Sequence, residues 1–205
     1  MKNKEITKRK MIDAIGKLLT EEGYESLGVN RIAKAAGIHK KLIYRYFDNA
    51  DNLIENYIVE KDFYMAFTEK LFELVKDHRE GTEKELIKYL MEQEFEYFYN
   101  EVEMQHIVKW QLSAGTPLIR SVSNAREHIR EKVMELTNSK FLNTGVNFNA
   151  VNALITGGLY HAVLNAKNNG SSIYGIDINQ ESQRKMLLFT AKQIIDWAFE
   201  ARNAS

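Results

Sequence analysis

Four side chains that can contact phosphates or base edges lie close together near the N-terminus. Lys40, Lys41 and Arg45 carry positive charge, and Tyr44 carries a phenolic hydroxyl. Lysine and arginine neutralise phosphates or donate hydrogen bonds to guanine O6 and N7, and a tyrosine hydroxyl can donate to a phosphate oxygen. This combination of residue types predicts contact with nucleic acid, provided that one rigid element presents all four side chains.

The surrounding sequence predicts that element as the second of two short helices. Apolar residues share one face of the segment from Val29 to Ala36, and a second helix is expected from Lys40 to Phe47. Gly37 lies between them and can adopt the left-handed conformation that a sharp turn requires. Two short helices joined by a glycine turn are typical of a helix-turn-helix, whose second helix enters the major groove of DNA.

Leu42 is an apolar residue on the expected outward face of the second short helix. Two interpretations of this residue are open. Its side chain could contact a thymine methyl group, which is a mode of sequence readout, or it could be partly buried in the core of the domain.

Longer amphipathic helices flank this pair. Apolar residues recur at spacings of three and four between Ile6 and Glu22, and Gly23 is expected to end that helix. Asn49 can cap the following helix, with Asp51 in its first turn, where the helix dipole favours a carboxylate.

The charge of the chain is divided unevenly, although its net charge is zero. Residues 1–48 hold 11 Lys and Arg against 6 Asp and Glu, a net charge of +5, and residues 49–205 hold 17 against 22, a net charge of −5. A basic end on an acidic body suits a protein of which only one end faces phosphate. Chance segregation of surface charge would give the same numbers, so the division supports the motif without replacing it.

The segment from Met11 to Leu53 resembles the DNA-binding domain of the TetR family of repressors, in one unbroken register. The resemblance covers roughly the first quarter of the chain, and the remaining residues match the family only in length and helical character. The matching residues are Ile12, Ala14, Leu18, Gly23, Tyr24, Val29, Ile32, Ala33, Ala36, Gly37, Ile38, Ile43, Tyr44, Tyr46, Phe47, Asp51 and Leu53.

The resemblance implies that Tyr44 and the start of the third helix lie on DNA. Combined with the chemistry of the neighbouring side chains, it gives a set of expected contacts on the two short helices. The expected DNA-contacting residues are Asn30, His39, Lys40, Lys41, Leu42, Tyr44, Arg45 and Tyr46.

Four departures from the usual pattern of the family affect the contacts rather than the fold. His39 occupies the position where a small hydroxyl residue would cap the third helix, and Lys41 and Leu42 replace small or hydroxyl residues. Gly28 stands where threonine often caps the second helix, and Ala50 replaces a frequent lysine. The operator sequence therefore does not follow from the resemblance.

Long helical patterns follow, punctuated by glycines. No stretch alternates with period two for long enough to indicate a sheet, so the expected fold is all-α. It consists of an N-terminal three-helix domain over residues 1–48, fused to a larger helical domain over residues 49–205. Residues 169–179 are expected to form a loop. The helices of the larger domain are expected at about 50–78, 82–100, 103–113, 117–137, 148–168 and 179–201.

The last two helices carry apolar stripes that suit a subunit interface. One stripe runs from Val151 to Val163, where Gly157 and Gly158 would allow close approach of helices, and a second covers the final helix. The resemblance implies a four-helix dimer interface built from these helices, and a palindromic site requires a two-fold dimer. The alternative is that both helices pack inside one subunit. The expected interface residues are Leu154, Gly158, His161, Phe189, Ile194 and Trp197.

Aromatic residues are dense between Tyr89 and Trp110. Tyrosine and tryptophan combine apolar area with one polar group, which suits an apolar pocket for a small molecule. Neighbouring aromatics on a helix cannot all face one cavity, so most are expected in the core, and we assign Tyr97, Trp110 and Tyr160 to a ligand. Acidic residues in the same region would either favour a cationic ligand or form a solvated face.

Glu103 and His106 have the i, i+3 spacing of one half of a di-iron carboxylate site. Such a site needs the motif twice, and the sequence has no second copy, so a surface pair is the stronger interpretation. A helical metal oxidase is the enzymatic alternative, and a helix-turn-helix protein that has lost DNA binding and binds another partner is the non-enzymatic one. No glycine-rich phosphate loop and no Gly-x-Ser-x-Gly motif occurs in the sequence.

Composition narrows the remaining classes. The chain has no cysteine, which excludes disulfides, thiolate metal sites and a cysteine nucleophile, and which fits a reducing compartment. The first residues are charged and no apolar stretch follows them, so we expect neither a secretory signal nor a membrane span. We expect a cytoplasmic protein that needs no cofactor and no metal.

Together these patterns predict a ligand-responsive transcriptional regulator rather than an enzyme. It would act as a repressor, bind palindromic double-stranded operator DNA as a homodimer, and be released by a small-molecule inducer. The inducer, the operator and the regulated genes have no signature in the sequence.

Overall fold

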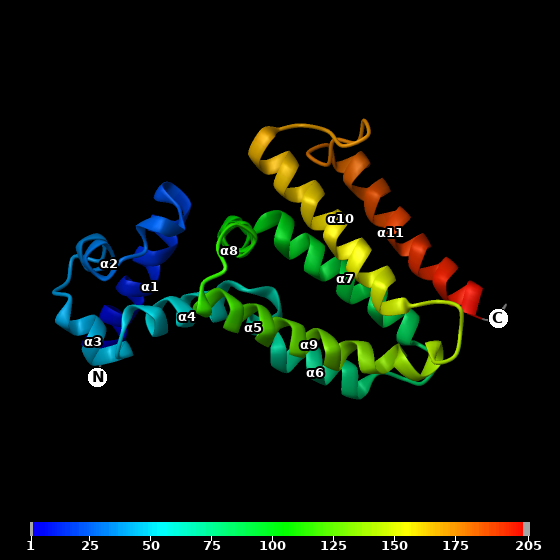
Figure 1. The fold of residues 1–205 in the computed structure, drawn as a ribbon, viewed down its shortest axis with the longest axis horizontal. Coiled ribbons are helices and arrows are strands. Elements are labelled where there is room, and N and C mark those ends of the chain that lie inside the picture. The colour runs from blue at the N-terminus through cyan, green and yellow to red at the C-terminus, as the bar shows by residue number, and fades with distance from the viewer. Residues whose placement is uncertain (1, 203–205) are drawn as a thin grey trace. The chain divides into compact units, whose positions relative to one another are not determined.

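The computed structural model describes residues 2–202, and its regular secondary structure in this range is helical (Figure 1). Within this range the only β-type pairing is an isolated bridge between Ile173 and Ile176, so the all-α prediction is confirmed. The elements are α1 Lys2–Glu22, the 3-10 helix η1 Tyr24–Ser26, α2 Val29–Ala35, α3 Lys41–Phe47, α4 Ala50–Lys61, α5 Phe63–Ala66, α6 Thr68–Asp77, α7 Glu83–Asn100, α8 Val102–Ser113, α9 Pro117–Phe141, α10 Phe148–Asn169 and α11 Glu181–Ala201.

The chain forms two compact units. The first contains the residues up to Thr68 together with Glu101–His128, and the second contains Glu69–Asn100 together with the residues from Ile129 onward. The helix α9 contributes residues to both units. The predicted domain boundary after residue 48 lies in the turn between α3 and α4, and the first unit extends beyond it to include α4, α5 and α8.

Helix α1 is the centre of the first unit. Met11, Ile15, Leu18 and Leu19 are buried on one face of it, at the spacings of three and four that characterise an amphipathic helix. This face packs against α2, α4 and α8, so the helix-turn-helix and the later helices share one core. The residues that α8 and α9 add to this core are Ile107, Trp110, Ile119 and Val122.

Two local signals in the helix-turn-helix act as predicted. Gly37 adopts a φ of 64°, the left-handed conformation, and the turn closes with a hydrogen bond of 3.0 Å from the Ile38 amide to the Ala33 carbonyl. The side-chain oxygen of Asn49 accepts a hydrogen bond of 2.7 Å from the Asn52 amide and so caps α4. Short-range residue preferences therefore define the turn before α3 and the start of α4 after it.

The helix predicted over residues 50–78 is wrong as a single element, because it breaks at Asp62 and again at Phe67, which gives α4, α5 and α6. The Asp62 backbone is extended, with φ −83° and ψ 132°, and its carboxylate accepts hydrogen bonds from the Tyr64 and Met65 amides. A carboxylate in this conformation caps a new helix instead of continuing the old one.

The Asp62 carboxylate also belongs to a buried polar network in the first unit. Its side chain has no exposed surface, and it accepts a hydrogen bond of 2.9 Å from Nε of Arg126, whose side chain is 7% exposed. Arg126 donates a second hydrogen bond of 2.6 Å to Gln111 on α8, and the Gln111 amide donates to the Ser123 hydroxyl at 2.9 Å. The network fixes the end of α4 to α8 and α9.

The second unit is a helical bundle in which α7, α10 and α11 pack together (Figure 1). Three rings form part of its core: Phe141 stacks on Phe148 at 4.4 Å, and Phe199 meets their edges at 5.0 and 5.2 Å. Because Phe141 belongs to this cluster, α9 continues four residues beyond its predicted end at 137. None of the described helices is long and apolar enough to span a membrane.

We predict that the Asp62–Arg126 pair stabilises the fold through coupling rather than through either charge alone. Removing one member leaves the other charge buried without its partner, so Arg126→Met should lower the free energy of unfolding by about 3 kcal/mol. The double variant Asp62→Asn with Arg126→Met should lose less than the sum of the two single variants. Urea denaturation of all four proteins measures this, and additive losses would contradict the coupling.

Candidate DNA-binding surface

Helix α3 has a buried face and a charged outer face. Ile43 and Phe47 lie in the core of the first unit, whereas Lys41, Tyr44 and Arg45 are exposed, Tyr44 to 49%. The alternation follows from the helical period, since residues three and four apart share a face. The three predicted contact residues therefore project from one side of a helix whose other side is anchored.

The residues that precede α3 connect it to α2. The Lys40 ammonium donates a hydrogen bond of 3.2 Å to the side-chain oxygen of Asn30, and both residues are exposed. His39 is also exposed, and its Nδ1 accepts a hydrogen bond of 3.2 Å from the Lys41 amide. The imidazole therefore satisfies an amide at the start of α3, the task that a hydroxyl residue would otherwise perform.

Leu42 and Tyr46 of α3 are less exposed than the charged residues of the same helix. Both are half-buried and pack against the core cluster of the first unit. For Leu42 this position corresponds to the burial interpretation, while part of its surface stays accessible. For Tyr46 the ring is flanked by Arg45, whose guanidinium lies 5.9 Å from the ring centroid.

The structure adds two cations that the sequence reasoning did not assign to this surface. Lys4 and Lys8 of α1 lie beside α3, with their ammonium groups 5.7 Å from the ring centroid of Tyr46 and 5.6 Å from that of Phe47. The signal was present in the basic composition of the first ten residues. Their place beside α3 depends on how α1 packs, which the spacing of the charges does not reveal.

His106 of α8 contacts α1 near its C-terminal end, at Leu19. Burial lowers the pKa of its imidazole from the ordinary value of 6.5, and the charge of Lys109 lowers the pKa further. A hydrogen bond to the Leu19 carbonyl acts in the opposite direction. Burial is the largest of these effects, so the buried position favours the neutral ring.

The three aromatic residues assigned to a ligand belong to different units. In the second unit, the Tyr160 hydroxyl donates a hydrogen bond of 2.7 Å to Glu94, its ring stacks on Phe98 at 4.0 Å, and Tyr97 is half-buried on α7. Trp110 lies in the first unit, where it stacks on Tyr24 at 5.6 Å.

The indole nitrogen of Trp110 is an unusual group within the described part of the chain. The side chain is 5% exposed, and its Nε1 is buried with no hydrogen-bond acceptor among residues 2–202. Buried donors in proteins are nearly always paired, so such a group calls for a functional or structural explanation.

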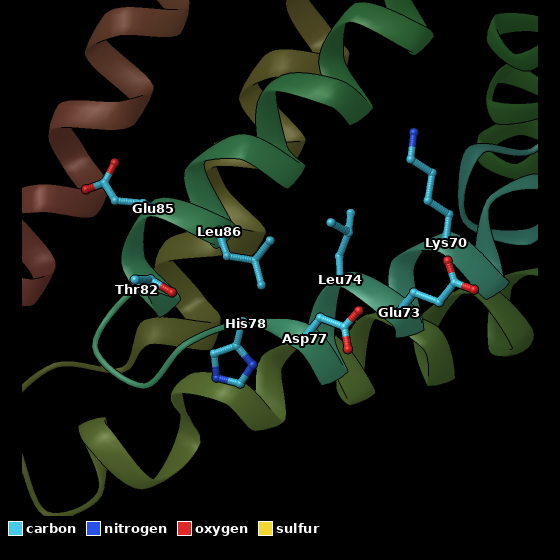
Figure 2. A pocket seen from close by; sticks show the side chains of 8 residues that line it. All are labelled: Lys70, Glu73, Leu74, Asp77, His78, Thr82, Glu85 and Leu86. Atoms are coloured by element: carbon cyan, nitrogen blue, oxygen red, sulfur yellow. The ribbon is translucent and has the colours of Figure 1, made fainter.

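A surface groove of about 420 Å³ lies in the second unit between the end of α6 and the start of α7 (Figure 2). Leu74 and Leu86 point toward each other across it, and its rim carries more acidic than basic side chains. None of the three predicted ligand residues lines this groove. The lining residues are Lys70, Glu73, Leu74, Asp77, His78, Thr82, Glu85 and Leu86.

The six residues predicted at a dimer interface are all exposed in the isolated chain. Leu154, Gly158 and His161 follow one another on α10 at spacings of four and three. On α11, Phe189 is 61% exposed and Trp197 is 55% exposed. Ile194 of α11 is also exposed.

The acidic residues of the body are largely occupied by ion pairs. Glu92 lies 2.8 Å from Lys192, Glu94 lies 2.9 Å from Arg130, and Glu103 lies 2.7 Å from Lys61. These pairs leave less anionic surface for a cationic ligand than the composition suggested. Within residues 2–202, no group of three or more metal-ligating side chains is close enough to hold an ion.

Comparison with known proteins gives one family match and several relatives. Residues 11–57 match the family of bacterial regulatory proteins, tetR family. The chain is 33% identical over 84 residues to the fatty acid metabolism regulator protein of Bacillus subtilis, and 36% identical over 78 residues to an HTH-type transcriptional regulator of Staphylococcus aureus. These alignments cover 41% and 38% of this chain, and 42% and 40% of the two relatives. Across the curated relatives, the matched part spans only 27% to 42% of their length.

Similar solved structures extend over nearly the whole chain. The crystal structure of FadR from Bacillus subtilis in complex with stearoyl-CoA has a TM-score of 0.64 and 20% identity, covering 94% of this chain and 98% of that chain. A SmeT–triclosan complex has a TM-score of 0.62 and 15% identity, covering 90% of both chains. At these identities the likeness establishes the fold.

The anchored α3 with its cationic outer face, set in an all-α fold, has the arrangement of a helix-turn-helix. The part of the chain that forms it, residues 11–57, is similar to the bacterial regulatory proteins of the tetR family.

We predict that the burial of the His106 ring destabilises the fold in acid. The pKa of His106 is lowered in the folded chain, so the unfolded chain binds this proton first as the pH falls. The stability that depends on the neutral ring is therefore present above pH 6.5, and it is lost as the pH falls from there through the folded pKa. The fall in melting temperature between pH 7.5 and pH 5.5 should be smaller in His106→Gln than in the wild type. An equal pH dependence in His106→Gln and the wild type would contradict the assignment.

Proposed function

We propose that this chain is a ligand-responsive repressor that binds palindromic operator DNA as a homodimer and releases it when a small molecule binds. The observation that carries the proposal is the outer face of α3, where Lys41, Tyr44 and Arg45 are exposed on an anchored helix. The match of residues 11–57 to the TetR family supports it. Such a protein acts in the cytoplasm, where its operator lies.

In this proposal the side chains of α3 contact the phosphates and bases of DNA according to their chemistry. Lys41 and Arg45 neutralise phosphates or donate to guanine, and the Tyr44 hydroxyl donates to a phosphate oxygen. Lys40 and Asn30 hold the starts of α2 and α3 together, and the accessible part of Leu42 is available to a thymine methyl group. Functionally, residues 1–48 form the DNA-binding domain and residues 49–205 the sensing and dimerisation domain.

Homodimerisation is supported by the exposed apolar stripe on α10 and α11. Leu154 is 78% exposed, and Phe189 and Trp197 are more than half exposed, which is unusual for side chains aligned on one stripe. Gly157 and Gly158 have open space above them, so a second helix could approach closely. A two-fold axis through this stripe would give a four-helix interface and two α3 helices about 34 Å apart, one turn of DNA.

The proposed effector is a largely apolar small molecule with a hydrogen-bond acceptor. The unpaired Nε1 of Trp110 supports this choice, because a ligand acceptor would satisfy it. Tyr97 and Tyr160 remain candidate ligand residues in the other unit. The likeness to a FadR structure that holds stearoyl-CoA makes stearoyl-CoA the first probe, and triclosan from the SmeT complex makes the second.

We predict that Lys41→Ala and Tyr44→Ala each weaken operator binding by about ten-fold or more. A symmetric dimer makes each contact twice, and one hydrogen bond to a charged group contributes about 1.5–3 kcal/mol, where about 1.4 kcal/mol corresponds to ten-fold. Lys41→Ala should also reduce the salt dependence of binding, by a slope of about 0.9 for each phosphate that the variant no longer neutralises. The operator comes first from selection of bound sequences in a random duplex pool, followed by anisotropy titrations at two salt concentrations.

Matched controls are available in the body of the protein. Lys132 is exposed on α9 and Tyr174 is fully exposed, so Lys132→Ala and Tyr174→Ala remove the same side chains away from α3. Both controls should bind like the wild type. If selection enriches no palindrome at low salt, or if the α3 variants bind like their controls, the chain is an interaction module of another kind.

We predict that Trp197→Glu converts the dimer into a folded monomer. The substitution places two charges in an apolar interface, whereas in the isolated chain the residue is already in water and its replacement leaves the subunit intact. Light scattering after size exclusion measures the mass, and circular dichroism checks the helix content. Leu142→Glu, at an exposed residue outside the stripe, is the control. A monomeric wild type, or a dimeric Trp197→Glu, would contradict the proposed interface.

A further inference from the structure

Glu103, whose spacing from His106 matches half of a metal site, is engaged elsewhere in the structure. From the first turn of α8 its carboxylate reaches α4, where one oxygen lies 2.7 Å from the Lys61 ammonium. Its other oxygen accepts a hydrogen bond of 3.2 Å from the hydroxyl of Tyr57, whose side chain is 1% exposed. Glu103 therefore binds two residues, one helical turn apart, on the helix that directly follows the recognition helix α3.

The same carboxylate lies over Gly16 of α1. A β-carbon at residue 16 would fall closer than 3.0 Å to Oε1 of Glu103, which real β-carbons essentially never do, and it would lie 3.2 Å from the Tyr57 ring. Glycine inside a helix is unfavourable relative to alanine, so its presence here needs a compensating contact. The missing side chain leaves a notch on α1 that the Glu103 carboxylate occupies.

Two further residues of α8 contact the chain after Gly16, one on α1 and one on η1. His106 lies one turn after Glu103 and hydrogen-bonds to the Leu19 carbonyl, and Trp110 follows one turn later and stacks on Tyr24 at 5.6 Å. Residues three, four and seven apart share a helix face. One face of α8 therefore contacts α1 at Gly16 and Leu19 and the 3-10 helix η1 at Tyr24.

We propose that Glu103 is a positioning residue for operator binding: seated in the Gly16 notch and held by Tyr57 and Lys61, it fixes α1 and α4, and with them α3, on α8. This inference rests on the proposed function, in which two α3 helices read one palindrome. A loosened contact lets each recognition helix sample more orientations, so the dimer discriminates less between operators of different half-site spacing.

The first test is a double-mutant cycle on thermal stability, which needs no DNA. Gly16→Ala should lower the melting temperature in the wild type, because the new methyl group displaces the carboxylate. In the Glu103→Ala background the same substitution should cost less by about 2–4 °C, since the carboxylate is gone, only the Tyr57 ring at 3.2 Å has to shift, and alanine favours the helix. Glu55→Ala, which removes an exposed carboxylate from α4, is the matched background and should keep the full wild-type loss. An equal effect of Gly16→Ala in all backgrounds would overturn the notch.

The second test measures spacing discrimination, the ratio of dissociation constants for the selected palindrome with and without one base pair inserted at its centre. Gly16→Ala and Glu103→Ala should lower this ratio by about five-fold or more, and Glu103→Gln, which keeps an oxygen for Tyr57, should retain more of it. Partial unfolding removes active protein from both titrations equally, so a purely structural role leaves the ratio unchanged.

The outcomes separate this inference from the proposed function. An unchanged ratio in the variants overturns the positioning role while operator binding stands. A wild type that prefers no palindrome overturns the proposed function, and the operator role of Glu103 with it, whereas the stability cycle still decides whether the notch holds the carboxylate.

Discussion

The burial of one face of α1 is the constraint on which the first unit depends. Helices α2 and α3 contain seven residues each, and helices of that length are not stable in water without packing. They become ordered because α1 supplies a continuous apolar surface, and because Ile107 and Trp110 of α8 complete the same core. The recognition helix is thus held by residues that follow it by some sixty positions in the chain. Any movement of α8 relative to α1 must therefore act on the core that also holds α3.

Buried charges give this packing its specificity. Asp62 and Arg126 are both withdrawn from water and satisfy each other, and Glu94 is paired with Arg130 in the second unit. Burying such groups is unfavourable unless every partner is in place, so each pair favours one arrangement of its helices over slipped alternatives. The two arginines are four residues apart on α9, so one helix takes part in a polar network in each unit. The exposed residues of the two units differ in character: α3 exposes cations, and α10 and α11 expose large apolar side chains.

Short-range signals in the sequence predicted much of the fold. The amphipathic period of α1, the left-handed turn at Gly37 and the cap at Asn49 depend on residues within a few positions of one another, and all three are found. The outward face of α3 was predictable for the same reason, since the helical period places Lys41, Tyr44 and Arg45 together once Ile43 is assigned to the core. Contact with DNA, the dimer interface and the ligand residues followed from the chemistry and spacing of side chains and remain proposals, because each needs a partner that a single chain does not contain.

The tertiary structure decided whatever depends on residues far apart in the chain. The carboxylate at the Asp62 break, besides capping α5, pairs with an arginine 64 positions later, and no local pattern indicates that pairing. Trp110 stacks on Tyr24 and so belongs to the same unit as the recognition helix, although its neighbours in sequence suggested a ligand pocket. The Glu103–His106 pair had the spacing of a metal motif, yet it docks on α1, because Gly16 leaves room for a carboxylate that local sequence cannot locate. The sequence by itself indicated most of the helices, though not the division of residues 50–78, and which of their faces are apolar, since these follow from period and propensity. Only the folded chain determined which distant side chains complete each core and each charge, since burial and pairing are properties of the assembled helices.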